Sequence, residues 1–228
     1  VVRSMADAAR EAGVLVVTGD TKVVNRGAAD KLFINTAGIG EIASGVDICG
    51  ANAQPSDVVI VSGTLGDHGA TILLEREQLG LTTNLSSDCA PLGGLVAAML
   101  AVCPQIRVLR DPTRGGLATA LNEIASQRQV GIELDEVSIP VKPAVRGVCE
   151  MLGLDPLYLA NEGKLVAIVP ADMAEQILVV MKKHPYGEDS TIIGQILDQP
   201  VDRLFMRTPY GSRRILDVMV SDPLPRIC

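Results

Sequence analysis

Apolar and polar residues alternate with two different periods along this chain. The first twelve residues carry an apolar face at helical spacing, and Gly13 is expected to end that helix. A buried strand, VLVVTGD (14–20), is predicted next, and a second apolar run, KLFINTAGI, occupies 31–39. Because a helix already under way at residue 1 feeds a buried strand, we expect the chain to be the greater part of a longer protein.

Beyond a polar turn at 53–56, strand and helix patterns follow one another. The predicted strands are 57–63, 106–110, 132–137, 164–169, 191–197, 203–207 and 213–220, and the predicted helices are 69–79, 93–102, 113–127, 142–152 and 171–183. The pattern predicts an α/β protein with a mixed sheet covered by helices. Its expected parts are one domain at 1–55, a second at 56–206, and a final strand and tail at 207–228.

Composition excludes several classes of function. Hydrophobic residues make up 47% of the chain but aromatic residues only 2%, so the core must consist of Val, Leu, Ile and Ala. The net charge is -7 and no cluster of Lys and Arg is interleaved with aromatic residues, so nucleic acid is an unexpected partner. The absence of a long apolar run and of a signal-like start predicts a cytoplasmic location. Five cysteines without C-x-x-C spacing predict reduced thiols.

The first candidate for chemistry is the loop Thr18-Gly19-Asp20-Thr21-Lys22, which follows the first predicted strand. Its glycine would let backbone N–H groups approach phosphate oxygens, its aspartate could hold Mg²⁺, and its lysine offers a positive charge to a transferring phosphoryl group. On spacing alone, an ordinary Gly-Asp turn is the more common explanation.

A second candidate is the segment RDPTRGG, in which a strand gives way to a helix and Thr113 is the predicted N-cap. Two glycines in a first helical turn cost about 1 kcal/mol each against alanine, so something must approach the backbone closely. That neighbour is either a phosphate with a metal, next to Asp111 and Arg114, or the protein's own sheet, with Asp111 as a capping acid.

Two further loops carry titratable residues. Asp67 and His68 begin a helix after a glycine-rich turn, where a histidine is more often a cap or a hydrogen-bonded packing residue than a catalyst. Glu162 and Lys164 flank Gly163 just before a buried strand, and the plain alternative for them is a solvated turn.

The chain ends in SDPLPRIC, so that Cys228 follows a segment stiffened by Pro223 and Pro225. At about 3.3 Å per residue, these eight residues could carry the thiol about 26 Å from the last strand. Such a tail could deliver a thiol into a cleft, whereas the plain alternative is an incidental terminal residue.

Five segments together resemble the HypE family of hydrogenase maturation proteins, and the resemblance covers the whole chain. They are TGDTKVV, SGTLGDHG, RDPTRGGLA, NEGKL and the terminal PRIC, which is the most specific of them. That family belongs to the AIR synthase-like (PurM-like) superfamily, with two α/β domains and ATP near the interface of a homodimer. The resemblance implies that 1–55 is the second half of the first domain.

The resemblance also implies a reaction. The terminal cysteine of HypE-like proteins receives a carbamoyl group from the carbamoyltransferase HypF, and ATP drives its dehydration to a thiocyanate. The cyanide then passes to iron on the HypC–HypD scaffold. Phosphorylating the carbamoyl oxygen turns a poor leaving group into phosphate, and a base must remove the amide protons.

By the same resemblance, Cys228 carries the substrate and Glu162 is the preferred base, while Lys22 is the cation or, if desolvated, a proton acceptor. The remaining implied roles fall into three sets: Asp20 and Asp111 for Mg²⁺, Thr18, Gly19, Thr21, Thr113, Arg114 and Gly115 for the phosphates of ATP, and Asp67 and His68 for the tail or the nucleotide.

Two alternatives remain open on the sequence. One is a related ATP-dependent enzyme that activates a free small-molecule amide or selenide, with Cys228 incidental. The other is a non-enzymatic scaffold for metallocentre assembly, in which the thiol only binds a metal or a partner.

Overall fold

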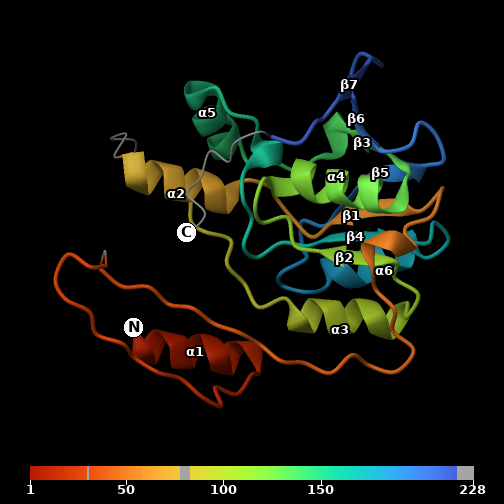
Figure 1. Ribbon diagram of the computed structural model, residues 1–228. Coiled ribbons are helices and arrows are strands. Elements are labelled where there is room, and N and C mark those ends of the chain that lie inside the picture. The colour runs from red at the N-terminus through yellow and green to blue at the C-terminus, as the bar shows by residue number, and fades with distance from the viewer. Residues whose placement is uncertain (30, 78–82, 220–228) are drawn as a thin grey trace. The chain divides into compact units, whose positions relative to one another are not determined.

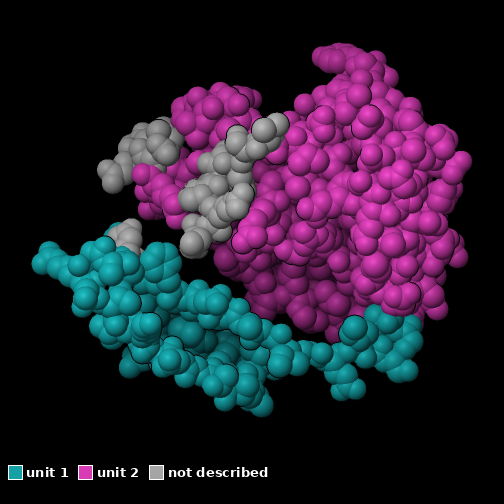
Figure 2. Space-filling model, viewed as in Figure 1, with its two compact units in different colours: residues 1–46 teal, residues 47–228 magenta. Residues whose placement is uncertain are grey.

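The computed structural model describes residues 1–29, 31–77 and 83–219, and the predicted tail with Cys228 lies outside the described residues. The chain divides into two compact units, 1–46 and 47–228, which are coloured separately in Figure 2. The predicted domain boundary at 55/56 stays a prediction. Among the residues that the structure describes, no helix combines the length and apolar character needed to cross a membrane.

The first unit contains helix α1, Val2–Ala12, as predicted. Gly13 ends it in the left-handed conformation, with φ 67°, and its N–H points back to Ala9 and Arg10 carbonyl oxygens. The predicted strand at 14–20 is wrong, because the structure describes no strand in this unit. A strand needs hydrogen bonds from a neighbouring strand, and here Leu15 and Val17 are 88% and 87% exposed.

The second unit is built on a seven-stranded sheet with the order β2-β4-β1-β5-β3-β6-β7. The strands are β1 Val58–Val61, β2 Val108–Arg110, β3 Gly131–Asp135, β4 Val166–Val169, β5 Thr191–Leu197, β6 Arg203–Arg207 and β7 Arg213–Ile215. All neighbours are antiparallel except β3 and β6, which are parallel. The predicted mixed α/β sheet is therefore confirmed.

Helices cover both faces of this sheet (Figure 1). They are α2 Asp67–Glu77, α3 Gly93–Val102, α4 Gly116–Arg128, α5 Pro143–Leu152 and α6 Ala174–Lys182, with short 3-10 helices at Gly50–Asn52, Glu136–Ser138 and Pro156–Tyr158. The core on one face includes α4, and the core on the other includes α3 and α6. Strand β1 is apolar throughout because Val59 and Val61 face α4 while Ile60 faces the other layer.

A smaller cluster joins α2 to α5, through Ala70 and Leu73 on one helix and Val145 and Val148 on the other. This cluster fixes the start of α2 next to the loops that precede β4, because Leu159 and Ala160 also belong to it. The first turn of α2 is thereby placed at the sheet edge where the candidate residues lie.

Candidate functional site

Three loops that the sequence singled out meet at one edge of the sheet. Val61 at the end of β1 and Arg110 at the end of β2 both pair with Val166 at the start of β4. Because β1 and β2 are each antiparallel to β4, their carboxyl ends and the amino end of β4 share an edge. The loops SGTLGD, RDPTRGG and NEGK are therefore neighbours by topology.

Asn161 is the residue that ties these loops together, and it is completely buried. The Gly66 N–H donates to its Oδ1 at 2.8 Å, and its Nδ2 donates to the carbonyl oxygens of Pro112 and Leu159, both at 3.0 Å. Its own backbone N–H donates to Pro112 O at 3.1 Å. Asn161 begins the segment NEGKL that resembles the family, but no role was predicted for it from the sequence.

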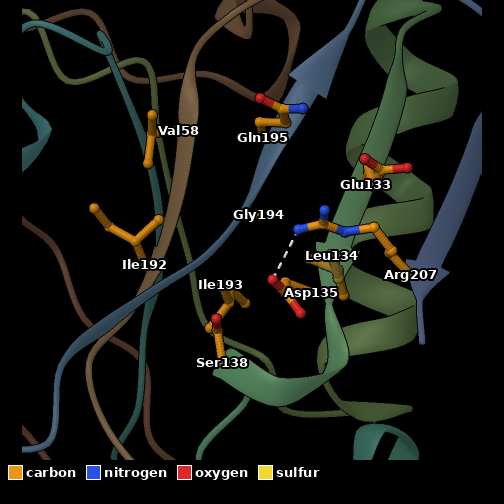
Figure 3. A pocket seen from close by; sticks show the side chains of 10 residues that line it. All are labelled: Val58, Glu133, Leu134, Asp135, Ser138, Ile192, Ile193, Gly194, Gln195 and Arg207. Atoms are coloured by element: carbon orange, nitrogen blue, oxygen red, sulfur yellow. Dashed lines mark hydrogen bonds and ion pairs between the residues drawn. The ribbon is translucent and has the colours of Figure 1, made fainter. Parts of the chain in front are cut away.

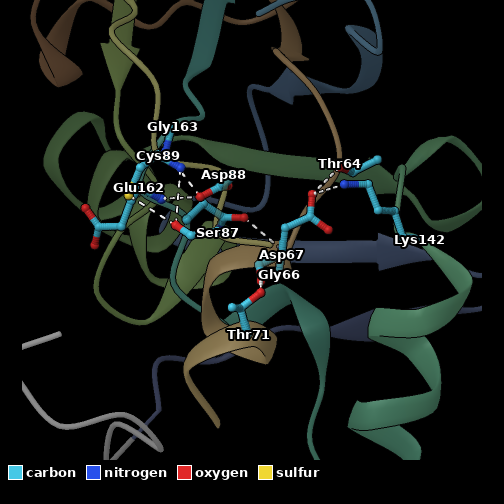
Figure 4. A network of polar contacts seen from close by, with 11 residues as sticks. Thr64, Gly66, Asp67, Thr71, Ser87, Asp88, Cys89, Lys142, Glu162 and Gly163 are labelled. Carbon is cyan, nitrogen blue, oxygen red and sulfur yellow. Dashed lines mark hydrogen bonds and ion pairs between the residues drawn. The ribbon is translucent and has the colours of Figure 1, made fainter. Parts of the chain in front are cut away.

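Glu162 follows Asn161 and is exposed, while its backbone is held by a fourth loop. Asp88 Oδ1 accepts hydrogen bonds from the N–H groups of Glu162, at 2.9 Å, and Gly163, at 3.3 Å. Figure 4 shows the Glu162 carboxylate pointing away from Asp88 while its amide faces it. The structure thus presents the expected base to solvent on a restrained backbone.

Asp67 and His68 are buried in the first turn of α2, at 1% and 5% exposure. Asp67 Oδ2 accepts from Thr64 Oγ1 and from Lys142 Nζ, the latter at 2.9 Å, and His68 Nδ1 lies 2.8 Å from Ser87 Oγ. Within the described part of the chain, Asp67 Oδ1 and His68 Nε2 have no hydrogen-bond partner. Both side chains are consequently placed to support the neighbouring loops from within.

The start of α4 differs from the prediction, because the N-cap is Gly115, with φ 67°, and not Thr113. The Thr113 hydroxyl donates to Asp111 Oδ2 at 2.9 Å. Gly116 also has a positive φ of 62°, and a Cβ there would lie 2.4 Å from Leu157 O. The close neighbour expected at these glycines is therefore present within the chain, as the 157–159 segment at Gly116 and the Thr119 side chain at Gly115 rather than the sheet.

Asp111 is exposed and paired with Arg110, the first residue of RDPTRGG, for which no role was predicted from the sequence. Arg110 Nη1 donates to Asp111 Oδ1 at 2.7 Å, and its Nη2 donates to Glu123 Oε2 at 3.1 Å. Partial burial by itself lowers the pKa of Arg110, but the hydrogen bonds and charges of Glu123 and Asp111 together hold this pKa above its ordinary value. Arg114 is exposed on the same turn.

The residues expected to bind phosphates and metal from the first unit are Thr18, Gly19, Asp20, Thr21 and Lys22. All five are exposed, and Asp20 Oδ1 accepts from the Thr21 N–H at 2.7 Å. That they gather with Asp111 and Glu162 stays a prediction.

The side chains of the candidate site supply part of what a bound metal ion would need. Among the residues that the structure describes, no three His, Cys, Asp or Glu side chains group as metal ligands. Mg²⁺ in nucleotide sites is commonly held by only one or two carboxylates together with phosphate oxygens and water. The exposed Asp111 carboxylate fits that chemistry, even with Thr113 and Arg110 as neighbours.

A separate cavity of about 270 Å³ lies over β1, β5, β3 and β6 (Figure 3). Asp135 and Arg207 line it and form an ion pair at 2.8 Å. None of the residues that the sequence analysis selected lines this cavity. The candidate site is therefore the sheet edge around Asn161 and Glu162.

Comparison with known proteins gives this site a family. The model of the AIR synthase related protein C-terminal domain matches 54–207, and that of the N-terminal domain matches 1–42. Carbamoyl dehydratase HypE of Azotobacter vinelandii is 54% identical over 228 residues, which are 100% of this chain and 67% of that protein. The chain spans about two thirds of the length of the curated relatives it matches.

Two solved structures agree with these matches. Hydrogenase maturation protein HypE in complex with ATP has a TM-score of 0.93 and 48% identity, covering 97% of this chain and 68% of that one. HypE from a HypE–HypF complex has a TM-score of 0.92 and 48% identity, covering 96% and 71%. This chain belongs to the HypE family of AIR synthase-related proteins.

Proposed function

We propose that this protein uses ATP to dehydrate a carbamoyl group carried on its own terminal cysteine, Cys228, to a thiocyanate. The thiocyanate would supply the cyanide ligands of iron during [NiFe]-hydrogenase maturation. The observation that carries this proposal is the junction at Asn161, which brings three glycine-containing loops together next to the exposed carboxylate of Glu162. Relatives named carbamoyl dehydratase HypE, and a HypE that binds ATP, support it.

The proposed reaction has two steps. The carbamoyl oxygen attacks the γ-phosphorus of ATP, and the bond from that phosphorus to ADP breaks. The carbon–oxygen bond then breaks with phosphate as the leaving group, while the nitrogen gives up both protons and the carbon–nitrogen triple bond forms. The products are the thiocyanate, ADP and phosphate, so that the carbamoyl group loses the elements of one water molecule.

Glu162 would take protons from the carbamoyl nitrogen. Its carboxylate is exposed and its backbone is held by Asp88, which suits a base that must reach a group arriving on a tail. Thr113, Arg114 and Gly115 would contact the phosphates, since Arg114 is exposed at the start of α4, where helix N–H groups favour anions. Asp67 and His68, which are buried, would support these loops through their contacts with Lys142 and Ser87.

The first unit would contribute the remaining groups. Thr18, Gly19 and Thr21 would contact phosphates, and Lys22 would supply a cation to the transferring phosphoryl group. Asp20 and Asp111 would hold Mg²⁺, which when bound spreads the charge of that group. Lys22 is the second candidate for proton acceptor.

Three partners follow from the proposal. A HypF-like carbamoyltransferase would load Cys228, and the HypE–HypF complex among the similar structures supports this. A HypC–HypD-like scaffold would receive the cyanide, and a second copy of the chain would form a homodimer. The site of action would be the cytoplasm.

The test is mass spectrometry of the complete protein after carbamoylation and addition of ATP with Mg²⁺. We expect Cys228 to lose the mass of one water as ADP forms, and Cys228→Ser to show no such product. Cys49→Ser is the matched control, because it removes an exposed thiol at a position that the proposal gives no role. An intact carbamoyl group after ATP has been consumed would refute the proposal. Turnover of a free amide by a variant lacking the last three residues would favour the small-molecule alternative.

A further inference from the structure

We infer that Asp88 is a positioning residue for Glu162, acting as a latch that fixes the backbone from which the base projects. This inference rests on the proposed function, in which Glu162 removes protons from the carbamoyl nitrogen. Asp88 belongs to none of the sequence segments that resemble the HypE family, and its role follows from its contacts.

One carboxylate oxygen of Asp88 serves two consecutive amides. Oδ1 accepts from Glu162 N–H at 2.9 Å and from Gly163 N–H at 3.3 Å. The other oxygen, Oδ2, is buried without a hydrogen-bond partner among the described residues. A carboxylate that accepts two backbone N–H groups orients the peptide planes on either side of the Glu162 Cα, and so sets the direction of its side chain.

The two loops are also in direct backbone contact. A Cβ on Gly163 would lie 1.7 Å from Asp88 O and 2.7 Å from Ala90 N. No other residue type could occupy this position without moving one of the loops. Glycine at 163 is therefore explained by the close approach of the loop at 87–90, and the spacing between Glu162 and Asp88 is fixed by backbone atoms.

The loop at 87–90, which contains Asp88, is itself anchored to helix α2. Ser87 Oγ accepts from the Cys89 N–H at 3.3 Å and lies 2.8 Å from Nδ1 of His68, which is buried. On the other side of Glu162, Asn161 is locked by its own hydrogen bonds. The backbone of Glu162 is thus held on one side by Asp88, as Figure 4 shows, and on the other by the hydrogen bonds of Asn161.

Positioning matters here because the Glu162 side chain is exposed, so its backbone must set where its carboxylate can reach. A misplacement of about 1 Å at a reacting group can cost about a hundredfold in rate. Losing the Asp88 carboxylate would free two amides and let the Glu162–Gly163 peptide rotate. The inference therefore predicts an effect on the chemical step and not on the binding of ATP.

The test compares Asp88→Ala, Asp88→Asn and Asp135→Ala in the complete protein, measuring single-turnover dehydration of the carbamoylated cysteine and the affinity for ATP. Asp88→Ala should slow dehydration by about 10- to 100-fold while ATP affinity changes by less than about twofold. Asp88→Asn should recover most of the rate, because its amide oxygen can accept the same two bonds. Asp135→Ala is the matched control, since Asp135 is half-buried and also accepts from a backbone N–H, that of Val137 at 3.2 Å.

A double-mutant cycle separates positioning from an independent role. If Asp88 acts through Glu162, then Asp88→Ala should add no further loss of rate to Glu162→Gln. Additive losses, or an Asp88→Ala enzyme as fast as the unchanged protein, would overturn the inference. An Asp88→Asn enzyme as slow as Asp88→Ala would also overturn it, because charge rather than the latch would then matter.

Amide hydrogen exchange distinguishes failure of this inference from failure of the proposed function. Exchange at Glu162 and Gly163 should accelerate in Asp88→Ala but not in Asp135→Ala. If exchange is unchanged, Asp88 is not a latch, whatever the reaction. If exchange accelerates but Glu162→Gln dehydrates normally, the base has been misassigned and the catalytic part of the inference falls with it.

Discussion

Replacing Asn161 with alanine should destabilise the second unit more than any other single loss of a polar side chain at the sheet edge. The side chain makes three hydrogen bonds to loops that are distant in sequence, and it has no exposed surface. Its removal leaves polar backbone groups behind in a place that water does not reach.

The magnitude follows from which groups lose their partners. Pro112 O keeps its bond from the Asn161 backbone N–H, so only the Gly66 N–H and Leu159 O are orphaned. An unsatisfied buried group costs about 1–3 kcal/mol, which gives a sum of about 2–6 kcal/mol. Because a water molecule could enter the vacated space and replace part of the loss, we expect about 2–4 kcal/mol.

The assay is urea unfolding followed by far-UV circular dichroism, because the chain has no tryptophan to report by fluorescence. Asn122→Ala is the matched control. Its Nδ2 also donates two hydrogen bonds, to Ala118 O at 2.8 Å and Leu216 O at 2.9 Å, but it is only half-buried. Solvent can replace those bonds, so the control should lose about 1 kcal/mol.

Asn161→Asp separates the hydrogen bonds from the cavity. The aspartate keeps the volume and the acceptor for Gly66 N–H, but turns an oxygen toward the carbonyls of Pro112 and Leu159. It should be at least as destabilising as alanine at neutral pH. A loss below about 1 kcal/mol for Asn161→Ala, at an unchanged m-value, would refute the reasoning, because the loops would then hold together without this residue.

Gly116→Ala should lower the free energy of unfolding by about 2–4 kcal/mol, because Gly116 has a positive φ and a Cβ there would meet Leu157 O. Gly147 lies in the middle of α5 with open space around it, so Gly147→Ala should raise the free energy of unfolding by about 0.5–1 kcal/mol. The midpoints of urea unfolding test both predictions. Lys142→Met should lower the free energy of unfolding by about 1–3 kcal/mol, since it leaves the buried carboxylate of Asp67 without its cation. Adding Asp67→Asn should recover part of that loss, and a double-mutant cycle in which the two losses simply add would contradict this prediction. Burial, and to a smaller extent the charge of Asp155, raises the pKa of Cys149 from 9.0 to about 11. The unfolded chain therefore loses this proton at a lower pH than the folded chain, so the free energy of unfolding should fall as pH rises from about 9 to about 11. Cys149→Ala should flatten this part of the stability profile, and an unchanged slope would contradict the prediction.

The sequence predicted most elements of the second unit because each has a local cause. The pattern of β1 is continuous apolar residues, which indicates a strand buried on both faces, and β1 does lie between two helical layers. The strand expected at 14–20 failed for the opposite reason. Its residues have a strand-like pattern, but a strand is a property of a hydrogen-bonded pair, and the described residues of the first unit supply no partner.

Local chemistry also misplaced the start of α4. Threonine is a good N-cap in general, but the Thr113 hydroxyl donates a hydrogen bond to Asp111. Helix α4 begins three residues after Thr113, at Gly116. The two glycines were recognised as a place of close approach. That the partner is the carbonyl of Leu157 could not be read from the sequence, because it depends on how two loops fold against each other.

The residues that hold the candidate site together were the hardest to find. Asn161 meets Gly66 across 95 positions of the chain, Asp88 meets Glu162 across 74, and Lys142 meets Asp67 across 75. No pattern within a single segment marks such a residue. Glu162 was selected because it stands just before a predicted buried strand, and the resemblance gave it the role of base, whereas its supporting contacts appear only when the loops are brought together.

This division has a physical reason. Glycine-rich loops leave room for a ligand, but they have few side chains with which to hold one another, so their relative positions must be fixed by something else. Here the antiparallel register brings the loops to one edge, and a single buried amide, Asn161, joins them. Burying that amide is favourable only while all of its hydrogen bonds are made, so the loops must keep one arrangement. Asp88 then needs to restrain only one peptide to aim Glu162. Losses at Asn161 should therefore appear as unfolding, and losses at Asp88 as a slower reaction in a folded protein.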